Sequence, residues 1–285
     1  MRGFLSLTAA WLVLAGCGPA AEPALSIQTY ASSETSAHLN THLILGERDA
    51  LLVDASMTRA DAEQVADRVT RSGRRLRAIF ITNSQPDKYL GLPVLVARFR
   101  EARVVSTPEV VADIAARGPG YLERLRARHG DAVIASPLVV PEPLAEDILE
   151  IEGERIRIER FVGGECPHAA AVYVPSLRAL LPGAIVFEGS HLFLRERDIP
   201  GWRAQLEELR VRDDIDRIYP GHGEPTGPEV LDAMERYLDD FEQAIATGDA
   251  DAAYAYMLER YPGYQLERLL REYSLPAYLD TRPKP

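Results

Sequence analysis

Cysteine and positive charge are both scarce in this sequence of 285 residues, and no internal repeat or low-complexity tract is visible. The two cysteines, Cys17 and Cys166, allow one disulfide at most, which excludes a disulfide-stapled scaffold. Acidic residues outnumber basic ones by 43 to 32, and the net charge of -11 would repel a phosphate backbone. The sequence therefore argues against a nucleic-acid partner.

Apolar residues are plentiful by comparison. They make up 46% of the chain, against 26% charged and 7% aromatic residues, which is the balance of a soluble globular protein rather than a disordered or fibrous one. The chain can therefore bury a sizeable core. Its length fits one large α/β or sandwich domain with an appendage better than two equal domains.

The first sixteen residues resemble the signal peptide of a bacterial lipoprotein. Arg2 supplies a positive charge, and the apolar run that follows, from Phe4 to Leu14, is too short to span a bilayer as a stable helix. The order Leu-Ala-Gly-Cys at 14–17 would make Cys17 the lipid-modified first residue of the mature chain. An ordinary cleaved secretory signal with a chance cysteine is the alternative.

This resemblance divides the start of the chain into a signal peptide, 1–16, and a short stiff tether, 17–24. It implies a protein of the bacterial cell envelope that is lipid-anchored to a membrane and faces the periplasm or the exterior. Acylation of Cys17 would leave Cys166 without a partner, so no disulfide is expected.

Hydrophobic periodicity beyond the tether predicts strands first and then strands alternating with helices. Strands are expected at 25–30, 41–45, 50–53, 77–82, 103–106, 148–151, 156–161, 170–174, 179–181 and 217–219. Helices are expected at 59–72, at 89–99, from 108 after the capping residue Thr107, around 121–128, and at 202–211, 230–246 and 249–259. Two arginine runs, at 71–77 and 124–128, are interpreted as helix ends that complement the helix dipole, not as binding patches.

Residues 82–92 follow a buried strand and open a helix, where an α/β sandwich presents side chains to a cleft. Their sequence, TNSQPDKYLGL, resembles the loop T-H-x-H-x-D-H-x-x-G-G of the metallo-β-lactamase-fold hydrolases. Four further stretches agree with that family in order and spacing: LLVD at 51–54, GECPH at 164–168 with VYVP at 172–175, LLPGAIVF at 180–187, and YPGHG at 219–223. The resemblance implies an α/β fold, namely an αββα sandwich over 25–227 with a C-terminal helical extension over 228–285.

In that family His and Asp side chains hold two zinc ions, which activate water. The resemblance puts a different residue at five ligand positions: Asn83, Gln85 and Lys88 for the first three histidines, Glu165 for the fourth, and Ala184 for the aspartate that bridges the metals. Asp87 and His222 are the two ligands that remain. An ammonium about 4 Å from a divalent ion would be repelled by up to roughly 8 kcal/mol at an effective dielectric constant of about 20. The resemblance therefore implies that the two-zinc centre has been lost.

Other polar residues near these motifs are given structural interpretations. Asp54 is expected to brace the site loop through hydrogen bonds, His168 to be a plain loop residue, and Cys166 to be a small packed thiol. Ser84 has no His-Asp companion in its sequence context, so a serine hydrolase is disfavoured.

Three functions remain open. In the first, no cofactor is expected and the protein is a non-catalytic pseudo-hydrolase that binds a small-molecule or envelope ligand or a partner; Lys88 then replaces the metal charge in a polar network with Asn83, Gln85, Asp87, Glu165 and His222. In the second, one divalent ion, zinc or another, is held by Asp87, Glu165 and His222 and hydrolyses an ester, lactone, lactam or related bond. In the third, catalysis is metal-free, with Asp87 and Lys88 as the candidate catalytic residues and Lys88 as base or nucleophile.

Overall fold

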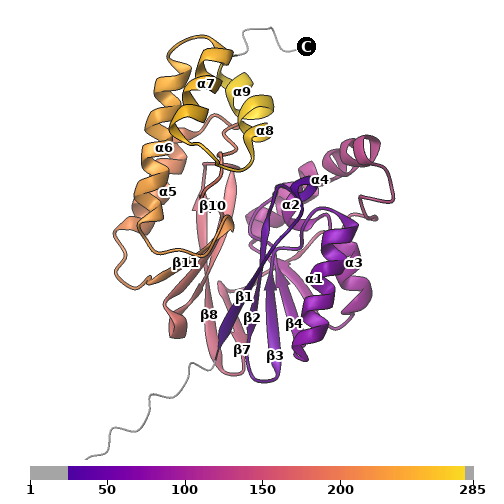
Figure 1. Ribbon diagram of the computed structural model, residues 1–285. Helices are drawn as coiled ribbons and strands as arrows, with labels where there is room; N and C mark the ends of the chain where they lie inside the picture. Colours follow the sequence, from indigo (N-terminus) through magenta and orange to yellow (C-terminus); the bar gives the residue numbers. More distant parts are fainter. Residues whose placement is uncertain (1–24, 280–285) are drawn as a thin grey trace, which may run out of the picture.

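The computed structural model describes residues 25–279, so the predicted signal peptide, the lipidation site Cys17 and the tether lie outside the described residues. Two β-sheets face each other, and helices cover the outer face of each (Figure 1). This arrangement is the αββα sandwich that the sequence motifs predict. Within residues 25–279, no helix combines the length and the apolar character that a membrane span requires.

The first sheet has six strands in the order β1-β2-β3-β4-β5-β6. Pairing is antiparallel from β1 to β3 and parallel from β3 to β6. Its strands are β1 (Ser26–Ala31), β2 (Asn40–Leu45), β3 (Asp49–Val53), β4 (Arg75–Phe80), β5 (Arg103–Ser106) and β6 (Glu142–Pro143), with the 3-10 turn η1 (Glu34–Ser36) after β1. The outer face packs on α1 (Arg59–Ser72), α3 (Leu92–Arg98) and α4 (Pro108–His129).

The second sheet has five strands in the order β11-β10-β9-β8-β7. Only the β10–β11 pair is parallel. Its strands are β7 (Ile148–Ile151), β8 (Glu154–Val162), β9 (His168–Val174), β10 (Ala179–Phe187) and β11 (Arg217–His222), with the 3-10 turn η2 (Pro175–Leu177) before β10. Its outer face packs on α5 (Ile199–Arg210) and α6 (Val230–Ile245).

The C-terminal helices continue this second helical layer. They are α7 (Ala250–Arg260), α8 (Glu267–Leu269), the π-helical turn η3 (Leu270–Ser274) and α9 (Leu275–Leu279). Buried side chains of these helices, such as Met257 and Leu270, share one hydrophobic cluster with α5, α6 and β10. The helical C-terminal region is therefore packed onto the second sheet.

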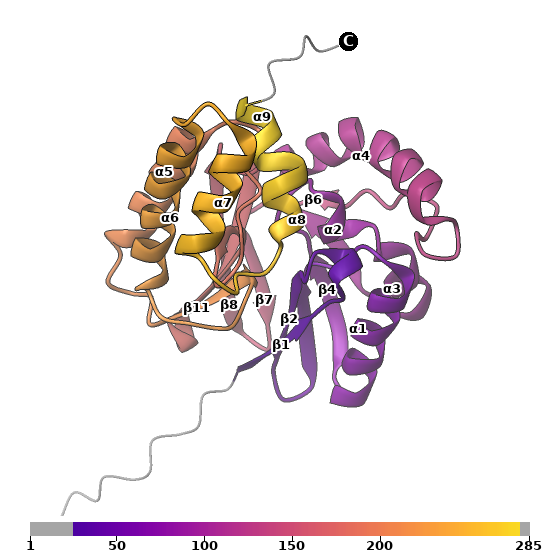
Figure 2. The same ribbon diagram turned by 45° about the horizontal axis from the view of Figure 1, so that its top comes forward.

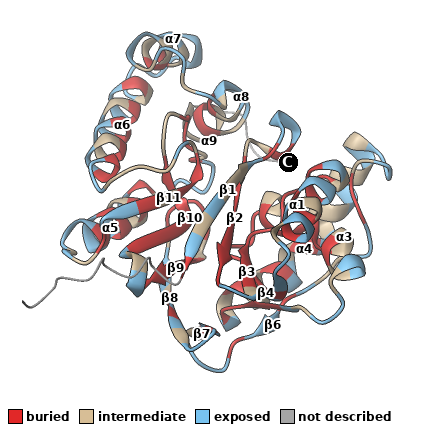
Figure 3. Ribbon diagram, turned by 60° about the horizontal axis from the view of Figure 1, so that its bottom comes forward, coloured by how far each residue is buried: buried red, intermediate tan, exposed pale blue. Residues whose placement is uncertain are grey.

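A third cluster fills the space between the two sheets. Ile44, Val53 and Phe80 of the first sheet belong to the same cluster as Ile156 and Val172 of the second. Strands covered on both faces need apolar side chains on both, and every residue of β2 and β10 is buried. In Figure 3 the inner strands such as β2, β3 and β10 are largely buried, whereas the outer helices carry buried and exposed residues together.

Three of the departures from the predicted elements have a clear structural reason. The helix expected at 89–99 is two helices, α2 (Pro86–Tyr89) and α3, because Gly91 lies against the loop after β3: its N–H donates to the Ser56 carbonyl, and a Cβ there would overlap the Ala55 carbonyl oxygen. The two helical segments expected between 108 and 128 form one continuous helix, α4, despite Pro119 in its interior. Strand β10 runs on to Phe187, because register shifts after Leu180 let it continue through the Pro-Gly pair.

Candidate functional site

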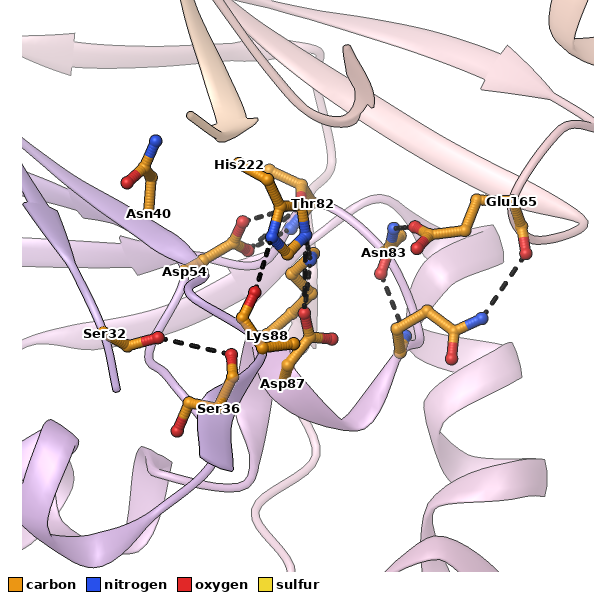
Figure 4. A network of polar contacts seen from close by, with 12 residues as sticks. Ser32, Ser36, Asn40, Asp54, Thr82, Asn83, Asp87, Lys88, Glu165 and His222 are labelled. Atoms are coloured by element: carbon orange, nitrogen blue, oxygen red, sulfur yellow. Dashed lines mark hydrogen bonds and ion pairs between the residues drawn. The ribbon is translucent and has the colours of Figure 1, made fainter. Parts of the chain in front are cut away.

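The candidate site lies where the loop after β4 meets the loop between β8 and β9 and the end of β11. An isolated β-bridge between Asn83 and Ala169 ties the first loop to the second sheet, and another joins Leu39 to His222. The polar side chains of these loops converge in Figure 4. The site is therefore built from segments far apart in the sequence.

Asp54 braces the site loop, as the sequence analysis expects. One of its carboxylate oxygens accepts the Thr82 N–H at 2.9 Å, and the Thr82 hydroxyl donates to the other at 2.8 Å (Figure 4). Burial raises the pKa of Asp54 to about 7, although Lys88 and these hydrogen bonds act in the opposite direction. Both groups of the pair are buried, so the course of the loop is fixed before it reaches Asn83.

Lys88 is the most unusual side chain of the site, because it is 0% exposed. Its Nζ lies 2.7 Å from Asp87 Oδ2 and 3.5 Å from His222 Nε2 (Figure 4). The same Asp87 oxygen is 3.8 Å from His222 Nε2. The ammonium thus contacts both of the residues, Asp87 and His222, that the sequence resemblance puts at unchanged ligand positions.

The charge of Lys88 is maintained despite its burial. Burial alone lowers its pKa, but the attraction of nearby carboxylates, Asp87 first among them, outweighs burial and raises the pKa above its usual value. Burial also raises the pKa of Glu165 to about 8. Asp87 is therefore the principal counter-ion of Lys88 at neutral pH.

His222 is neutral and firmly held. The Asn40 amide donates to the carbonyls of Pro220 and Gly223 on either side of it, and its ring stacks on Phe187 with centroids 4.4 Å apart. Its Nδ1 lies 2.9 Å from the Ala37 carbonyl oxygen, so Nδ1 carries the proton and Nε2 accepts from Lys88. Burial, with Lys88 as the second cause, holds the pKa of His222 well below its usual value.

Asn83, Gln85 and Glu165 form a second group beside the first. The Asn83 amide donates to Glu165 Oε2 at 3.0 Å, and the Gln85 backbone N–H donates to Asn83 Oδ1 at 2.9 Å. The Gln85 side chain donates to the Glu165 carbonyl oxygen at 3.4 Å. Glu165 reaches Lys88 only through the longer-range charge interaction, and Ala184 is buried in β10 with no polar group to offer.

Two further residues singled out from the sequence lie just outside these groups. Cys166 is buried, and its thiol donates to the His168 carbonyl at 3.2 Å. His168 begins β9, and its Nδ1 lies 2.9 Å from Asp113 Oδ2 of α4. His168 is therefore the first residue of a strand with a carboxylate partner, not the plain loop residue that the sequence predicts.

A cavity of about 400 Å³ opens over the site. Gln85, Asp87, Glu165 and His222 are among the residues that line it, and all of them except Asp87 are buried. Sequence reasoning missed the rest of its lining, which includes Tyr121, Arg124, Arg128, Phe193, Arg195, Arg268, Leu269 and Tyr273. The arginine run at 124–128 is a signal for this surface, but it is interpreted from the sequence as a helix end.

The residues present do not fit a zinc centre. Among residues 25–279, no group of three or more His, Cys, Asp or Glu side chains is placed to hold a metal ion. Asp87 and His222, the retained ligand types, both face the Lys88 ammonium instead. Asn83 and Gln85 offer neutral amides, which are poor zinc ligands.

Comparison with known proteins identifies the family to which this chain belongs. The family model of the metallo-beta-lactamase superfamily matches residues 38–222, well over half of the chain. The chain belongs to the metallo-beta-lactamase superfamily. No curated protein sequence matches closely enough to name a relative.

Solved structures of this superfamily share the fold at low sequence identity. A metallo-beta-lactamase family protein from Thermus thermophilus is 20% identical with a TM-score of 0.62, over 88% of this chain and 93% of that one. A beta-lactamase domain protein from Burkholderia ambifaria is 17% identical with a TM-score of 0.64, over 91% and 85%. A metallo-beta-lactamase from Pontibacter korlensis is 19% identical with a TM-score of 0.55, over 75% and 93%. At these levels of identity the similarities show a shared fold and do not show a shared activity.

The raised pKa of Asp54 predicts a pH-dependent stability. Between about pH 4 and pH 7 the folded protein keeps a proton on Asp54 that the unfolded chain has lost, so this group makes folding less favourable as pH rises. Asp54→Asn mimics the protonated form. The free energy of unfolding of the variant, relative to the parent, should rise by about 1.4 kcal/mol per pH unit across that window.

Urea unfolding of both proteins at pH 4.5, 6 and 8 measures this difference. Asp49→Asn is a matched control, because Asp49 pairs with exposed Arg75 on the surface. A parent–variant difference that stays constant from pH 4.5 to 8 would show that Asp54 is ionised in the folded protein.

Proposed function

We propose that this protein is a lipid-anchored member of the superfamily, located in the bacterial cell envelope, that binds a ligand in its cleft without hydrolysing it. The observation that carries the proposal is the buried Lys88 ammonium, in contact with Asp87 and His222. Hydrolysis on this fold depends on metal-activated water. Here the Lys88 ammonium lies beside Asp87 and His222, where the resemblance would put a metal ion.

Two features weigh against metal-free catalysis by Lys88. Its raised pKa keeps it protonated, so it has no lone pair for attack or proton abstraction. It is also fully buried and is not among the residues that line the cavity. A substrate in the cavity would meet Asp87, Glu165 and His222 before it could reach Lys88.

The alternative of a single-metal hydrolase is weakened by the separation of its three ligands. Asp87 and His222 contact Lys88, whereas the Glu165 carboxylate is taken up by the Asn83 amide. A metal would have to displace the ammonium and break that hydrogen bond. An ammonium that stayed in place would repel the divalent ion.

Hydrolysis assays test this proposal. Purified protein is expected to hydrolyse a chromogenic cephalosporin, a nitrophenyl ester and a bis-nitrophenyl phosphodiester at the rate of buffer alone. Added zinc or EDTA should change nothing. Turnover that EDTA abolishes, and that both Asp87→Asn and His222→Ala remove, would overturn the proposal in favour of the single-metal hydrolase.

The membrane anchor is tested separately through Cys17. Parent protein is expected in the membrane fraction with a fatty-acylated N-terminal cysteine, whereas Cys17→Ser should be soluble or remain an unprocessed precursor. Cys166→Ser is the matched control and should stay in the membrane fraction, because Cys166 is a buried thiol. Mass spectrometry of the mature N-terminus decides: an unmodified end at any other residue would exclude the lipoprotein.

A further inference from the structure

The cavity above the site carries an unusual concentration of positive charge for so acidic a protein. Four arginines line it: Arg124, Arg128, Arg195 and Arg268. They come from three separate segments, namely α4, the connection between β10 and α5, and the C-terminal α8. Figure 2 shows α4 on the side of the first sheet and α8 among the C-terminal helices.

These arginines lack the close carboxylate partners that other arginine clusters in the protein possess. Arg203, for comparison, contacts the carboxylates of three residues of α6, and Arg157 and Arg212 share Asp214. Arg117 and Arg126, which lie near them, pair with Glu196 and Asp131, whereas Arg124 and Arg195 make no ion pair within 4.0 Å among the described residues. The positive charge around the cavity is therefore incompletely neutralised within the described part of the chain.

The other two arginines have one carboxylate between them, at long distance. Glu272 Oε2 lies 4.0 Å from Arg128 Nη2 and 3.8 Å from Arg268 Nε. Arg128 also donates to the Tyr273 hydroxyl at 3.3 Å, which fixes its direction along the cavity wall. Asp87, which also lines the cavity, is already paired with Lys88. An entering anion would thus meet more positive than negative charge.

Apolar and aromatic side chains fill the spaces between the arginines. The cavity wall includes Leu125, Phe193, Leu269 and the rings of Tyr121 and Tyr273. The Arg124 guanidinium lies over the Tyr121 ring, 4.9 Å from its centroid, in a cation–π contact. Such a wall favours a ligand with an apolar body as well as a charged head.

The C-terminal part of this wall lies outside the residues that the family model matches. The family model ends at residue 222, whereas Arg268, Leu269 and Tyr273 lie beyond it. The contact from Arg128 to Tyr273 joins this segment to α4 across the cavity. The C-terminal helices therefore form part of the wall of the cavity.

From this arrangement we infer that the cavity binds a small anionic amphiphile, a carboxylate or phosphate monoester with an apolar or aromatic body, whose charge is held by Arg124, Arg195 and their neighbours. Guanidinium groups match both anions, because each offers a planar pair of donors to two oxygens. The inference deepens the proposed function and rests on the cleft being a ligand site.

A pair of fluorescent probes that differ in charge tests the inference. 8-Anilinonaphthalene-1-sulfonate carries an anionic group on an aromatic body, and N-phenyl-1-naphthylamine has the same rings without the sulfonate. The anionic probe should bind at least about tenfold more tightly, and its Kd should rise with salt while that of the neutral probe does not. Equal Kd values for the two probes, or binding of neither, would overturn the inference.

Substitutions locate the binding. Arg124→Gln with Arg195→Gln should raise the Kd of the anionic probe at least about tenfold and leave that of the neutral probe unchanged. Arg77→Gln with Arg155→Gln removes the same charge from exposed positions in β4 and β8 and is the matched control, with less than about twofold change expected. If both pairs of substitutions weaken the probe equally, the effect is one of overall charge, and the inference fails.

Displacement of the probe distinguishes the two anions. Decanoate and decyl phosphate should compete with the anionic probe, and decanol should not. The anion that competes more strongly identifies the preferred head group. Competition by decanol alone would contradict the inference. The outcome is independent of the hydrolysis assays. If the two probes bind equally, the anion site is excluded but the proposal of a non-catalytic protein is unaffected. If the protein shows EDTA-sensitive turnover, the non-catalytic proposal is wrong and the anion site would bind a substrate.

Discussion

Lys88→Met is expected to lower the free energy of unfolding by about 3 to 5 kcal/mol. The substitution keeps most of the apolar stem but removes the ammonium, so Asp87 loses its counter-ion at 2.7 Å in a buried setting. For a domain of this size the melting temperature should fall by roughly 10 °C. Differential scanning calorimetry of parent and variant measures the change.

Arg103→Met is the matched control for that experiment. Arg103 pairs with Glu142 at 3.2 Å, but the two side chains are 61% and 67% exposed, so solvent screens the pair and its loss should cost at most about 1 kcal/mol. The difference in stability between the two variants shows how much burial adds to the contribution of the ion pair. If Lys88→Met and Arg103→Met have the same melting temperature, the Lys88 ammonium is solvated and does not stabilise the cleft.

Lys88→His is expected to bring a metal back to the cleft. Asp87 Oδ2, His222 Nε2 and the Lys88 ammonium lie within 4 Å of one another, so a histidine at 88 completes a set of two imidazoles and one carboxylate. The variant should take up about one zinc ion, and zinc at about 100 times its Kd should stabilise it by about 2.7 kcal/mol. The parent should show no zinc-dependent change in melting.

Lys88→Met is also the control for this gain of metal. It removes the positive charge without supplying a ligand, so it separates relief of repulsion from coordination. Zinc should stabilise the histidine variant far more than the methionine variant. Equal stabilisation of the two would show that charge alone had kept the metal out, and no response from either would show that Asp87 and His222 are not oriented for coordination.

Much of the fold could be predicted because its signals are local. The periodicity of 59–72, with Gly73 following it, predicts helix α1 to the residue; Gly73 adopts the left-handed conformation that ends it. Thr107 caps α4 as expected, with its side chain accepting the Val110 N–H. The helix prediction failed where tertiary contacts decide. The continuous helix expected at 89–99 is interrupted at Gly91, whose close approach to the 55–56 loop cannot be seen from neighbouring residues.

The candidate site was harder to predict, because its properties arise from distant segments. The motif identified Asp87, Lys88 and His222 as neighbours in the cleft, yet the direction of each side chain depends on contacts such as His222 to Ala37 and Asn40 to Pro220. A lysine in a loop gives no local sign that it will be fully buried. The arginine-lined cavity likewise depends on helices that meet only in three dimensions.

The zinc content of the purified parent protein shows whether the Lys88 ammonium keeps a metal ion out of the cleft. Protein expressed in zinc-supplemented medium and purified without chelators can be measured by plasma mass spectrometry. We expect well under one zinc ion per chain, because the Lys88 ammonium faces both Asp87 and His222. Stoichiometric zinc that disappears in Glu165→Ala would contradict it and establish a metal centre at this site.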